Sequence, residues 1–399
     1  MRNFIFISPH FPDTYWKFCL ALKNKGFNVL GVGDAPYDQI PNECKFALTE
    51  YYCCSNMDNY ENESRAIKYF KDKYGEIEWL ESMNEYWLEK DAQLRTDFDV
   101  KFGIRANEIK KYKLKSDEKK YFQAANANVA DWILVKDKED TDKIKAFINK
   151  VGLPVFCKPN VGVGSQFTFK IEKIEDIETF FLKKHNCDYI CEEFIDGQIV
   201  SFDGITNSKA DVIFCDEHVF MPSVAFIVEK GLDDMYYCRP NVEKDLEDLG
   251  RKVVKSFNVK NRFFHIEFFR TFKDTHFGPK GTLVALEANM RCPGGYSSDL
   301  INFANSVSCY NIYADSCAYD ENREDLNQEK FYACAPSRRY AFNYFHTEEE
   351  ILLKYRNFIC MYGDYPKVLR DDLGDRYYFA KFSTLSEVNE FDEFVRMKK

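Results

Sequence analysis

The chain has 399 residues, of which 45% are hydrophobic, and this length suits about two to four domains with cores of their own. Its formal charge of −10 argues against a general binder of nucleic acids or of anionic membranes, so we expect no nucleic-acid partner. No apolar run approaches the roughly 20 residues that a membrane-spanning helix needs, so we expect no membrane partner either.

The chain opens with alternating strand and helix patterns. Residues 3–8 form an apolar run typical of a buried strand, the stretch from Trp16 to Gly26 has the spacing of an amphipathic helix, and residues 27–32 form a second strand. This order predicts a right-handed parallel unit and a Rossmann-like first domain. The absence of a Gly-x-Gly-x-x-Gly motif argues against a dinucleotide site. The side chains expected at the carboxyl ends of the strands, either as substrate contacts or as plain loop residues, are Ser8, His10, Glu81, Asn84 and Glu85.

Two later segments supply lysines and glycines of the kind that bind phosphate. Lys115 and Lys119 lie four apart on one face of a helix predicted over 114–126, where a solvated face is the alternative. A buried strand over 154–157 leads into Lys158. Glycines let backbone N–H groups approach phosphate oxygens, and the adjoining lysine adds positive charge; an ordinary hairpin is the plainer interpretation. The loop after Lys158 contains Gly162, Gly164 and Ser165.

The segment 188–204 is predicted to contain a strand that ends in Glu192 and Glu193, followed by Phe194 and Ile195. Between two lobes, such a segment exposes backbone N–H and C=O groups that can contact the edge of an adenine. The alternative is an ordinary strand that ends in a turn.

Two apolar, aromatic-rich strands within 263–288 each contain one carboxylate, Glu267 in the first and Glu287 in the second. Glycines and a proline between them predict a hairpin, and Asn289 shares a strand face with Glu287. Carboxylates in apolar strands are costly unless positive charge neutralises them. With Arg291 nearby, these oxygen ligands predict a site for Mg²⁺ and phosphate; acids on the solvent side of an edge hairpin are the alternative.

The fourteen cysteines are scattered without a Cys-x-x-Cys pair, and Cys157 lies in an apolar run where cysteine behaves as a small hydrophobic residue. The two close groupings lack histidines or further cysteines at zinc-binding spacing. We therefore expect reduced cysteines and a cytoplasmic protein. These two groupings are Cys53 with Cys54 and Cys187 with Cys191.

The order of these parts resembles that of the ATP-grasp superfamily, in particular its carboxylate–amine or carboxylate–thiol ligases. The resemblance covers residues 1–330. It implies an α/β and α+β multidomain fold, in which a Rossmann-like preATP-grasp domain precedes two lobes that clamp ATP. The motifs that support it are GLPVFCKPNVGVGS, CEEFIDG, FFHIEFF and LEANMRCPGG.

By position in these motifs, the resemblance implies nucleotide-binding roles. Lys115 and Lys158 are similar to the lysines that contact the phosphates, with Lys113 and Lys119 as neighbouring alternatives for the first. The loop 160–165, which includes Gly162, Gly164 and Ser165, is similar to the flap over the phosphates. Glu192, Glu193, Phe194 and Ile195 are similar to the segment that contacts adenine.

The resemblance also implies metal-binding and catalytic roles. Glu267, Glu287 and Asn289 match the metal ligands, and Arg291 matches the arginine that stabilises the acyl phosphate or the tetrahedral intermediate. Many members place a ribose-binding glutamate near the position of Ile199. With isoleucine there, Asp203 is the remaining candidate for that contact.

The function that the resemblance implies is an ATP-dependent ligase, which activates a carboxylate as an acyl phosphate, joins it to an amine and releases ADP and phosphate. Its cofactors are ATP and Mg²⁺, with Mn²⁺ as the alternative ion, and its partners are small-molecule carboxylate and amine substrates; a homodimer is left open. The alternatives are an ATP-grasp enzyme that uses bicarbonate or another acceptor, and a non-catalytic nucleotide-binding protein. The substrate-pocket candidates are Glu85, Arg239 and Arg291.

We accordingly expect four domains. The predicted preATP-grasp domain spans 1–110. The first ATP-grasp lobe, with the glycine flap, spans 111–195, and the second lobe, with the metal site, spans 196–330. A small α+β domain over 331–399, with a helix at 385–396, completes the chain.

Overall fold

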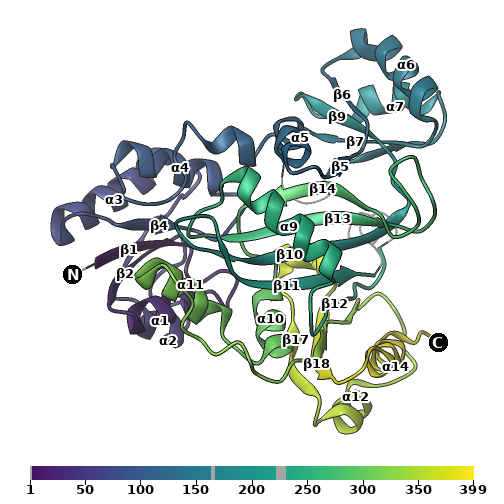
Figure 1. Cartoon of the computed structure of the whole chain (residues 1–399). Coiled ribbons are helices and arrows are strands. Elements are labelled where there is room, and N and C mark those ends of the chain that lie inside the picture. The colour runs from purple at the N-terminus through teal and green to yellow at the C-terminus, as the bar shows by residue number, and fades with distance from the viewer. Residues whose placement is uncertain (1, 163–166, 222–230) are drawn as a thin grey trace.

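The computed structural model describes residues 2–162, 167–221 and 231–399. Its strands form three sheets, which Figure 1 shows in three regions of the molecule. One sheet belongs to the N-terminal part, a second to a small lobe at the upper right of the view, and the third runs through the centre to the C-terminal part. This arrangement is the multidomain α/β and α+β architecture expected from the sequence.

The N-terminal sheet has four parallel strands in the order β3, β2, β1, β4. β1 and β2 pair in parallel, and a helix connects them along the chain, so the prediction of a parallel opening unit is confirmed. The strands are β1 (Arg2–Ile7), β2 (Phe27–Gly33), β3 (Glu50–Cys53) and β4 (Trp79–Glu81). The helices are α1 (Trp16–Asn24), α2 (Asn42–Ala47), α3 (Tyr60–Tyr74) and α4 (Leu88–Asp97).

The small lobe contains an antiparallel sheet of four strands in the order β6, β9, β7, β8. Apolar side chains of two helices pack on this sheet and form its core. The strands are β6 (Trp132–Val135), β7 (Val155–Pro159), β8 (Phe169–Ile171) and β9 (Tyr189–Glu193). The helices are α6 (Thr141–Val151) and α7 (Asp176–Lys183).

One cysteine pair in this lobe differs from the expectation of reduced thiols. Cys157 and Cys191 lie opposite each other in β7 and β9 and form a disulfide. The two cysteines are 34 residues apart, so only the register of the two strands brings them together. The other twelve cysteines in the described part of the chain are free.

The large sheet has ten strands, nine of them in the order β16, β18, β15, β12, β11, β10, β13, β14, β5, with β17 also paired to β18. The strands of its central part are β5 (Asn128–Val129), β10 (Gly197–Thr206), β11 (Val212–Phe220), β12 (Tyr236–Cys238), β13 (Phe263–Thr271) and β14 (Leu283–Asn289). The C-terminal strands are β15 (Tyr332–Cys334), β16 (Ser337–Arg338), β17 (Ile359–Asp364) and β18 (Arg376–Phe382).

Helices cover both faces of the large sheet. On one face, buried Val253 and Phe257 of α9 pack on the sheet, and Gly250 lets this helix approach the ring of Phe202. The helix predicted at 385–396 is confirmed as α14. The helices of this part of the chain are α5 (Lys115–Ala124), α9 (Lys244–Phe257), α10 (Ser297–Asn305), α11 (Cys309–Tyr319), α12 (Glu348–Tyr355), α13 (Arg370–Leu373) and α14 (Leu385–Arg396).

Each sheet lies within one or more of the expected domains, while the boundaries of these domains stay predictions. The N-terminal sheet lies within 1–110 and the small-lobe sheet lies within 111–195. The strands after residue 331, however, continue the sheet of the second lobe, because β15 pairs with β12. The C-terminal segment therefore shares a hydrophobic core with that lobe.

The N-terminal domain is joined to the large sheet through an apolar core and a buried ion pair. The ring of Phe18 on α1 contacts Tyr310 and Tyr313 of α11 edge to face. Nη1 of Arg262, which directly precedes β13, lies 2.5 Å from Oε1 of Glu81 at the end of β4. A buried charge pair of this kind fixes the relative position of the two elements, because separating it would leave a charge unpaired.

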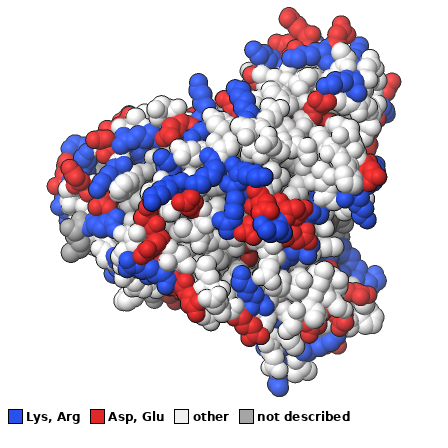
Figure 2. All heavy atoms as spheres, in the orientation of Figure 1, with Lys and Arg blue, Asp and Glu red and all other residues white. Residues whose placement is uncertain are grey.

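Acidic and basic side chains are interspersed on the face shown in Figure 2, where clusters of both signs lie next to each other. Among the described helices, none has the length and apolar character that crossing a bilayer requires.

Candidate active site

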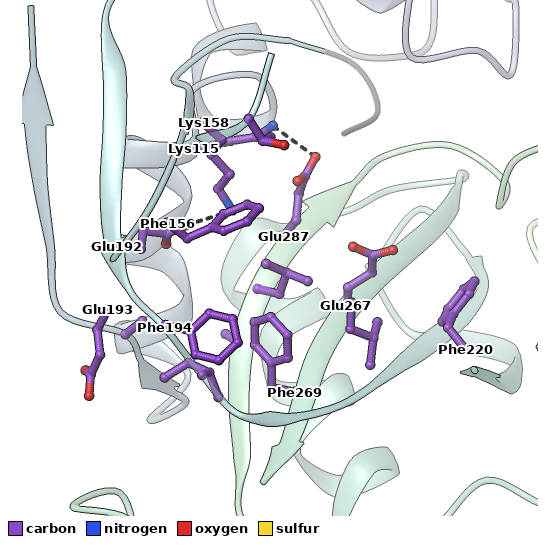
Figure 3. Close-up of a pocket in the computed structure, with 16 residues that line it drawn as sticks. Lys115, Phe156, Lys158, Glu192, Glu193, Phe194, Phe220, Glu267, Phe269 and Glu287 are labelled. Carbon is purple, nitrogen blue, oxygen red and sulfur yellow. Dashed lines mark hydrogen bonds and ion pairs between the residues drawn. The ribbon is translucent and has the colours of Figure 1, made fainter. Parts of the chain in front are cut away.

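A cavity lies between the small lobe and the large sheet, and residues of α5, β7, β9, β13 and β14 line it (Figure 3). One part of the lining is charged and another part is apolar. The charged residues are Lys115, Lys158, Glu192, Glu193, Glu267 and Glu287. The large apolar residues are Phe156, Phe194, Ile195, Ile199, Phe220 and Phe269.

The two predicted metal-binding acids face each other across neighbouring strands. Glu267 of β13 and Glu287 of β14 are paired residues of an antiparallel hairpin, so the predicted pairing of these strands is confirmed. Asn289 is paired with His265 and shares a strand face with Glu287. Figure 3 shows the two carboxylates side by side, pointing the same way. Hard oxygen ligands therefore converge from two strands, as a Mg²⁺ site requires.

Lysines from two other elements neutralise the acids of the cavity. Nζ of Lys115 lies 3.0 Å from Oε1 of Glu287, and the Nζ atoms of Lys119 and Lys158 lie 2.5 and 2.8 Å from the two oxygens of Glu192. Burial alone would raise the pKa of Glu192, but the two lysines outweigh it and lower this pKa to about 2. Burial likewise opposes the charge of Lys115, yet Glu287 raises the pKa of that lysine. Glu192 and Lys115 are thus both ionised at neutral pH.

Helix α5 contributes another acid, Glu118, which is not among the site residues predicted from the sequence. Its Oε2 accepts a hydrogen bond of 3.1 Å from the backbone N–H of Ala288. Burial and the charge of Glu287 raise the pKa of Glu118 to about 7. The available signal was its position three residues after Lys115, on the same helix face, within a helix otherwise noted only for its lysines.

The other part of the cavity is apolar and bounded by aromatic rings. The rings of Phe156 on β7 and Phe269 on β13 line it from the two lobes, and Phe194 lies between the lobes. At this point the backbone N–H of Glu193 donates to the carbonyl of Asp131, while Figure 3 shows the Glu193 carboxylate pointing away from the acids. A slot with aromatic walls beside charged groups suits a flat heteroaromatic ring attached to phosphates.

Solved structures share this fold over nearly the whole chain. An L-amino acid ligase from Bacillus licheniformis superimposes with a TM-score of 0.72 at 12% identity, and the match covers 98% of this chain and 96% of that one. The order of the motifs and the facing acids agree with this shared fold. This chain has the ATP-grasp fold.

Curated relatives match shorter stretches of the chain. D-alanine–D-alanine ligase B of Clostridium perfringens is 40% identical over 89 residues, which are 22% of this chain and 29% of that ligase. The L-arginine-specific L-amino acid ligase of Bacillus subtilis is 24% identical over 215 residues, 50% of this chain and 48% of that ligase. The chain therefore spans less than half the length of these curated relatives. No protein-family model matches it.

The glycine flap expected of an ATP-grasp protein begins beside the first lysine. The backbone N–H of Lys115 donates to the carbonyl of Asn160, and the Asn160 side chain accepts from the N–H of Ser116. The start of the loop is therefore anchored to the first turn of α5, and Gly162 follows it. Positions 163–166, with Gly164 and Ser165, lie outside the described residues.

Arg291 lies at the junction of the ATP-grasp lobe with the N-terminal domain. Its Nη1 donates to the carbonyl of Cys292 at 2.9 Å, and its Nε lies 3.9 Å from Oε2 of Glu85. Glu85 also accepts from Nζ of Lys113 at 2.9 Å. Two of the residues predicted for the substrate pocket, Glu85 and Arg291, are thus neighbours. The third, Arg239, instead pairs with Glu217 of the interior strand β11.

The structure does not bring Asp203 to the cavity between the small lobe and the large sheet. Ile199 lines the cavity, but Asp203 lies four residues further along β10, and at about 3.3 Å per residue this is about 13 Å away. The Asp203 carboxylate is buried and contacts His218 and His265 instead. Burial opposes its ionisation, yet His265 and His218 lower the pKa of Asp203. Asp203 is therefore corrected from a ribose contact to a residue of the sheet interior.

Proposed function

We propose that the chain is an ATP-dependent ligase that activates a carboxylate as an acyl phosphate, joins it to an amine and releases ADP and phosphate. The observation that carries the proposal is the facing pair of Glu267 and Glu287, with Lys115 and Lys158 in the same cavity. Phosphoryl transfer depends mostly on positioning and charge stabilisation, so acids for metal ions and lysines for phosphates are the groups that it needs.

In this proposal Glu267, Glu287 and Asn289 bind the metal ions. Their hard oxygen donors on one strand face suit Mg²⁺, with Mn²⁺ as the alternative. Burial would raise the pKa of Glu287, but the charge of Lys115 outweighs burial and lowers it, so the carboxylate is ready to act as a ligand. Magnesium bound there would neutralise phosphate charge during transfer.

The nucleotide in this proposal lies along the cavity from its apolar to its charged part. The adenine would lie near Phe156 and Phe269, with its edge at the backbone of Glu193 to Ile195. The phosphates would then reach Lys115 and Lys158, where they replace the carboxylates that those lysines contact in the structure. The flap that contains Gly162, Gly164 and Ser165 would cover them.

The names of the relatives support amino acids as the substrates to test first, because one ligase is named for D-alanine and the other for L-arginine. We place the substrate at Glu85 and Arg291. Oε2 of Glu85 is buried and has no hydrogen-bond partner within the described residues, so it can accept from a substrate ammonium group. Arg291 would stabilise the negative charge that develops as the amine attacks. We place the reaction in the cytoplasm, and a homodimer stays a prediction.

The test is ADP and phosphate release in the presence of Mg²⁺ and ATP, with L- and D-amino acids offered singly and in pairs. Hydroxylamine would trap an acyl phosphate as a hydroxamate. We expect release of ADP and phosphate only when a carboxylate and an amine are both present. Release with bicarbonate alone would favour the alternative acceptor, and nucleotide binding without turnover across the panel would overturn the ligase proposal.

A further inference from the structure

Polar side chains cross the large sheet in two adjacent rows that begin at the proposed magnesium ligands. Because alternate residues of a strand point to the same side, both rows lie on one face of the sheet. The first row follows paired residues of β14, β13, β10, β11 and β12 and consists of Glu287, Glu267, Ser201, His218 and Cys238. The second row, two residues away along each strand, consists of Asn289, His265, Asp203 and Asp216.

The far ends of the rows bring three different metal-ligating side chains together. Asp216 and His218 are two apart on β11, and Cys238 is the residue paired with His218 on β12. One ligand atom from each lies within 4.8 Å of the other two. Sγ of Cys238 lies 3.3 Å from Nε2 of His218, and Oδ2 of Asp216 lies 3.8 Å from Nδ1 of that histidine. Ligands of a tetrahedral zinc ion lie about 3.3–3.8 Å apart, and Cys238 and His218 already have this spacing. The Asp216 carboxylate would have to turn towards Nε2 of His218 to complete the geometry.

The imidazole of His218 is oriented as a metal-bound histidine would be. Its Nδ1 lies 2.7 Å from Oδ2 of Asp203. An ionised carboxylate can only accept a hydrogen bond, so the ring proton lies on Nδ1, and in the neutral ring the lone pair of Nε2 is directed to the side of Cys238. A carboxylate that fixes the second nitrogen of a histidine is typical of zinc sites.

The carboxylate of Asp216 has one oxygen held firmly and one oxygen held weakly. Nδ2 of Asn305 on α10 donates to Oδ1 at 2.6 Å. Oδ2 is buried and, apart from the weak thiol donor of Cys238, has no hydrogen-bond partner within the described residues; Asp216 is 2% exposed. A buried carboxylate oxygen without a strong donor is costly. A cation between Asp216, His218 and Cys238 would remove this cost.

We propose that Asp216, His218 and Cys238 bind a divalent transition-metal ion, with Zn²⁺ as the first candidate, at a site separate from the proposed magnesium site. A thiolate, an imidazole and a carboxylate form a donor set of intermediate softness, which favours zinc over magnesium. Binding releases the thiol proton of Cys238, and a small fourth ligand such as water completes the tetrahedron. The role is structural, because the ion joins β11 to β12 within the sheet that presents Glu267.

The direct test is the metal content of the full chain, purified from zinc-supplemented cells without chelators and measured by plasma mass spectrometry. About one zinc per chain is expected, and Asp216→Asn and Cys238→Ser should each reduce it at least tenfold. Cys334→Ser is the matched control, because Cys334 is equally buried on the neighbouring strand β15 but lies outside the cluster. Its zinc content should equal that of the wild type.

A second measurement uses the wild type alone, so that a variant that fails to fold leaves the proposal testable. Chelator-treated protein is titrated with Co²⁺, and a thiolate-to-cobalt charge-transfer band is expected that saturates at one equivalent. Wild-type protein that carries no zinc and gives no such band would overturn the proposal, as would zinc binding that persists in Cys238→Ser. Neither readout depends on ADP release, so this result and that of the ligase test are independent.

Discussion

Replacing Glu192 by glutamine removes the carboxylate that holds the buried amines of Lys119 and Lys158 at 2.5 and 2.8 Å. The pKa of Glu192 is about 2 against an ordinary value of 4.5. At about 1.4 kcal/mol for each tenfold change in proton affinity, this difference corresponds to a stabilisation of the charged form on the order of 3 kcal/mol. Breaking a buried ion pair by removing one partner costs about the same, since a charge is left unpaired.

The assay is urea unfolding of the wild type and of Glu192→Gln, followed by tryptophan fluorescence at pH 7. The m-value rises with chain length, and at about 3 kcal/mol/M or more for a chain of this size a loss of about 3 kcal/mol lowers the midpoint by up to about 1 M. Because the folded-state pKa of Glu192 is depressed, this stabilisation is present above pH 4.5 and is lost as the pH falls towards 2. The difference between the two proteins should therefore shrink in acid.

Glu193→Gln is the matched control, because its carboxylate points away from the acids and lies 3.5 Å from the exposed ring of His276. We expect that variant to unfold close to the wild type. Saturating ADP should raise the midpoint of Glu192→Gln more than that of the wild type, since phosphates replace the missing negative charge. A midpoint of Glu192→Gln that matches the Glu193→Gln control would refute the reasoning.

Three further substitutions test the cavity and its support. Glu287→Gln should reduce ADP release about 100-fold or more with an unchanged circular dichroism spectrum; retained turnover would remove Glu287 from the metal site. Ile199→Glu should increase the calorimetric affinity for ADP relative to its dideoxyribose analogue, and an unchanged ratio would place the ribose elsewhere. Gly250→Ala should destabilise the second lobe by about 1–3 kcal/mol in urea, because the new Cβ would lie 2.2 Å from the Phe202 ring; a variant as stable as the wild type would contradict this packing.

Much of the fold was predictable because it depends on local patterns. Apolar alternation located the strands that contain Glu267 and Glu287, and turn residues between them predicted the hairpin that pairs them. Helical spacing located α1 and α14. In each case the residues that determine the structure are within a few positions of one another.

Part of the site could not be predicted, because it depends on which distant strands become neighbours. Asp203 was expected to contact the ribose because it is four residues from Ile199 in the sequence. Its position on β10 instead directs it towards His265 on β13. Cys157 meets Cys191 for the same reason, through the register of β7 and β9. No local pattern encodes such pairings.

The sequence by itself determined the chemical groups and their order along the chain: lysines, a glycine loop, facing acids and an arginine. Tertiary structure alone decided that the C-terminal strands extend the sheet of the second lobe, and that Asp216, His218 and Cys238 meet at its interior. The physical reason is that side-chain alternation fixes the face on which a residue lies, whereas hydrogen-bond register between strands fixes the residue that it meets.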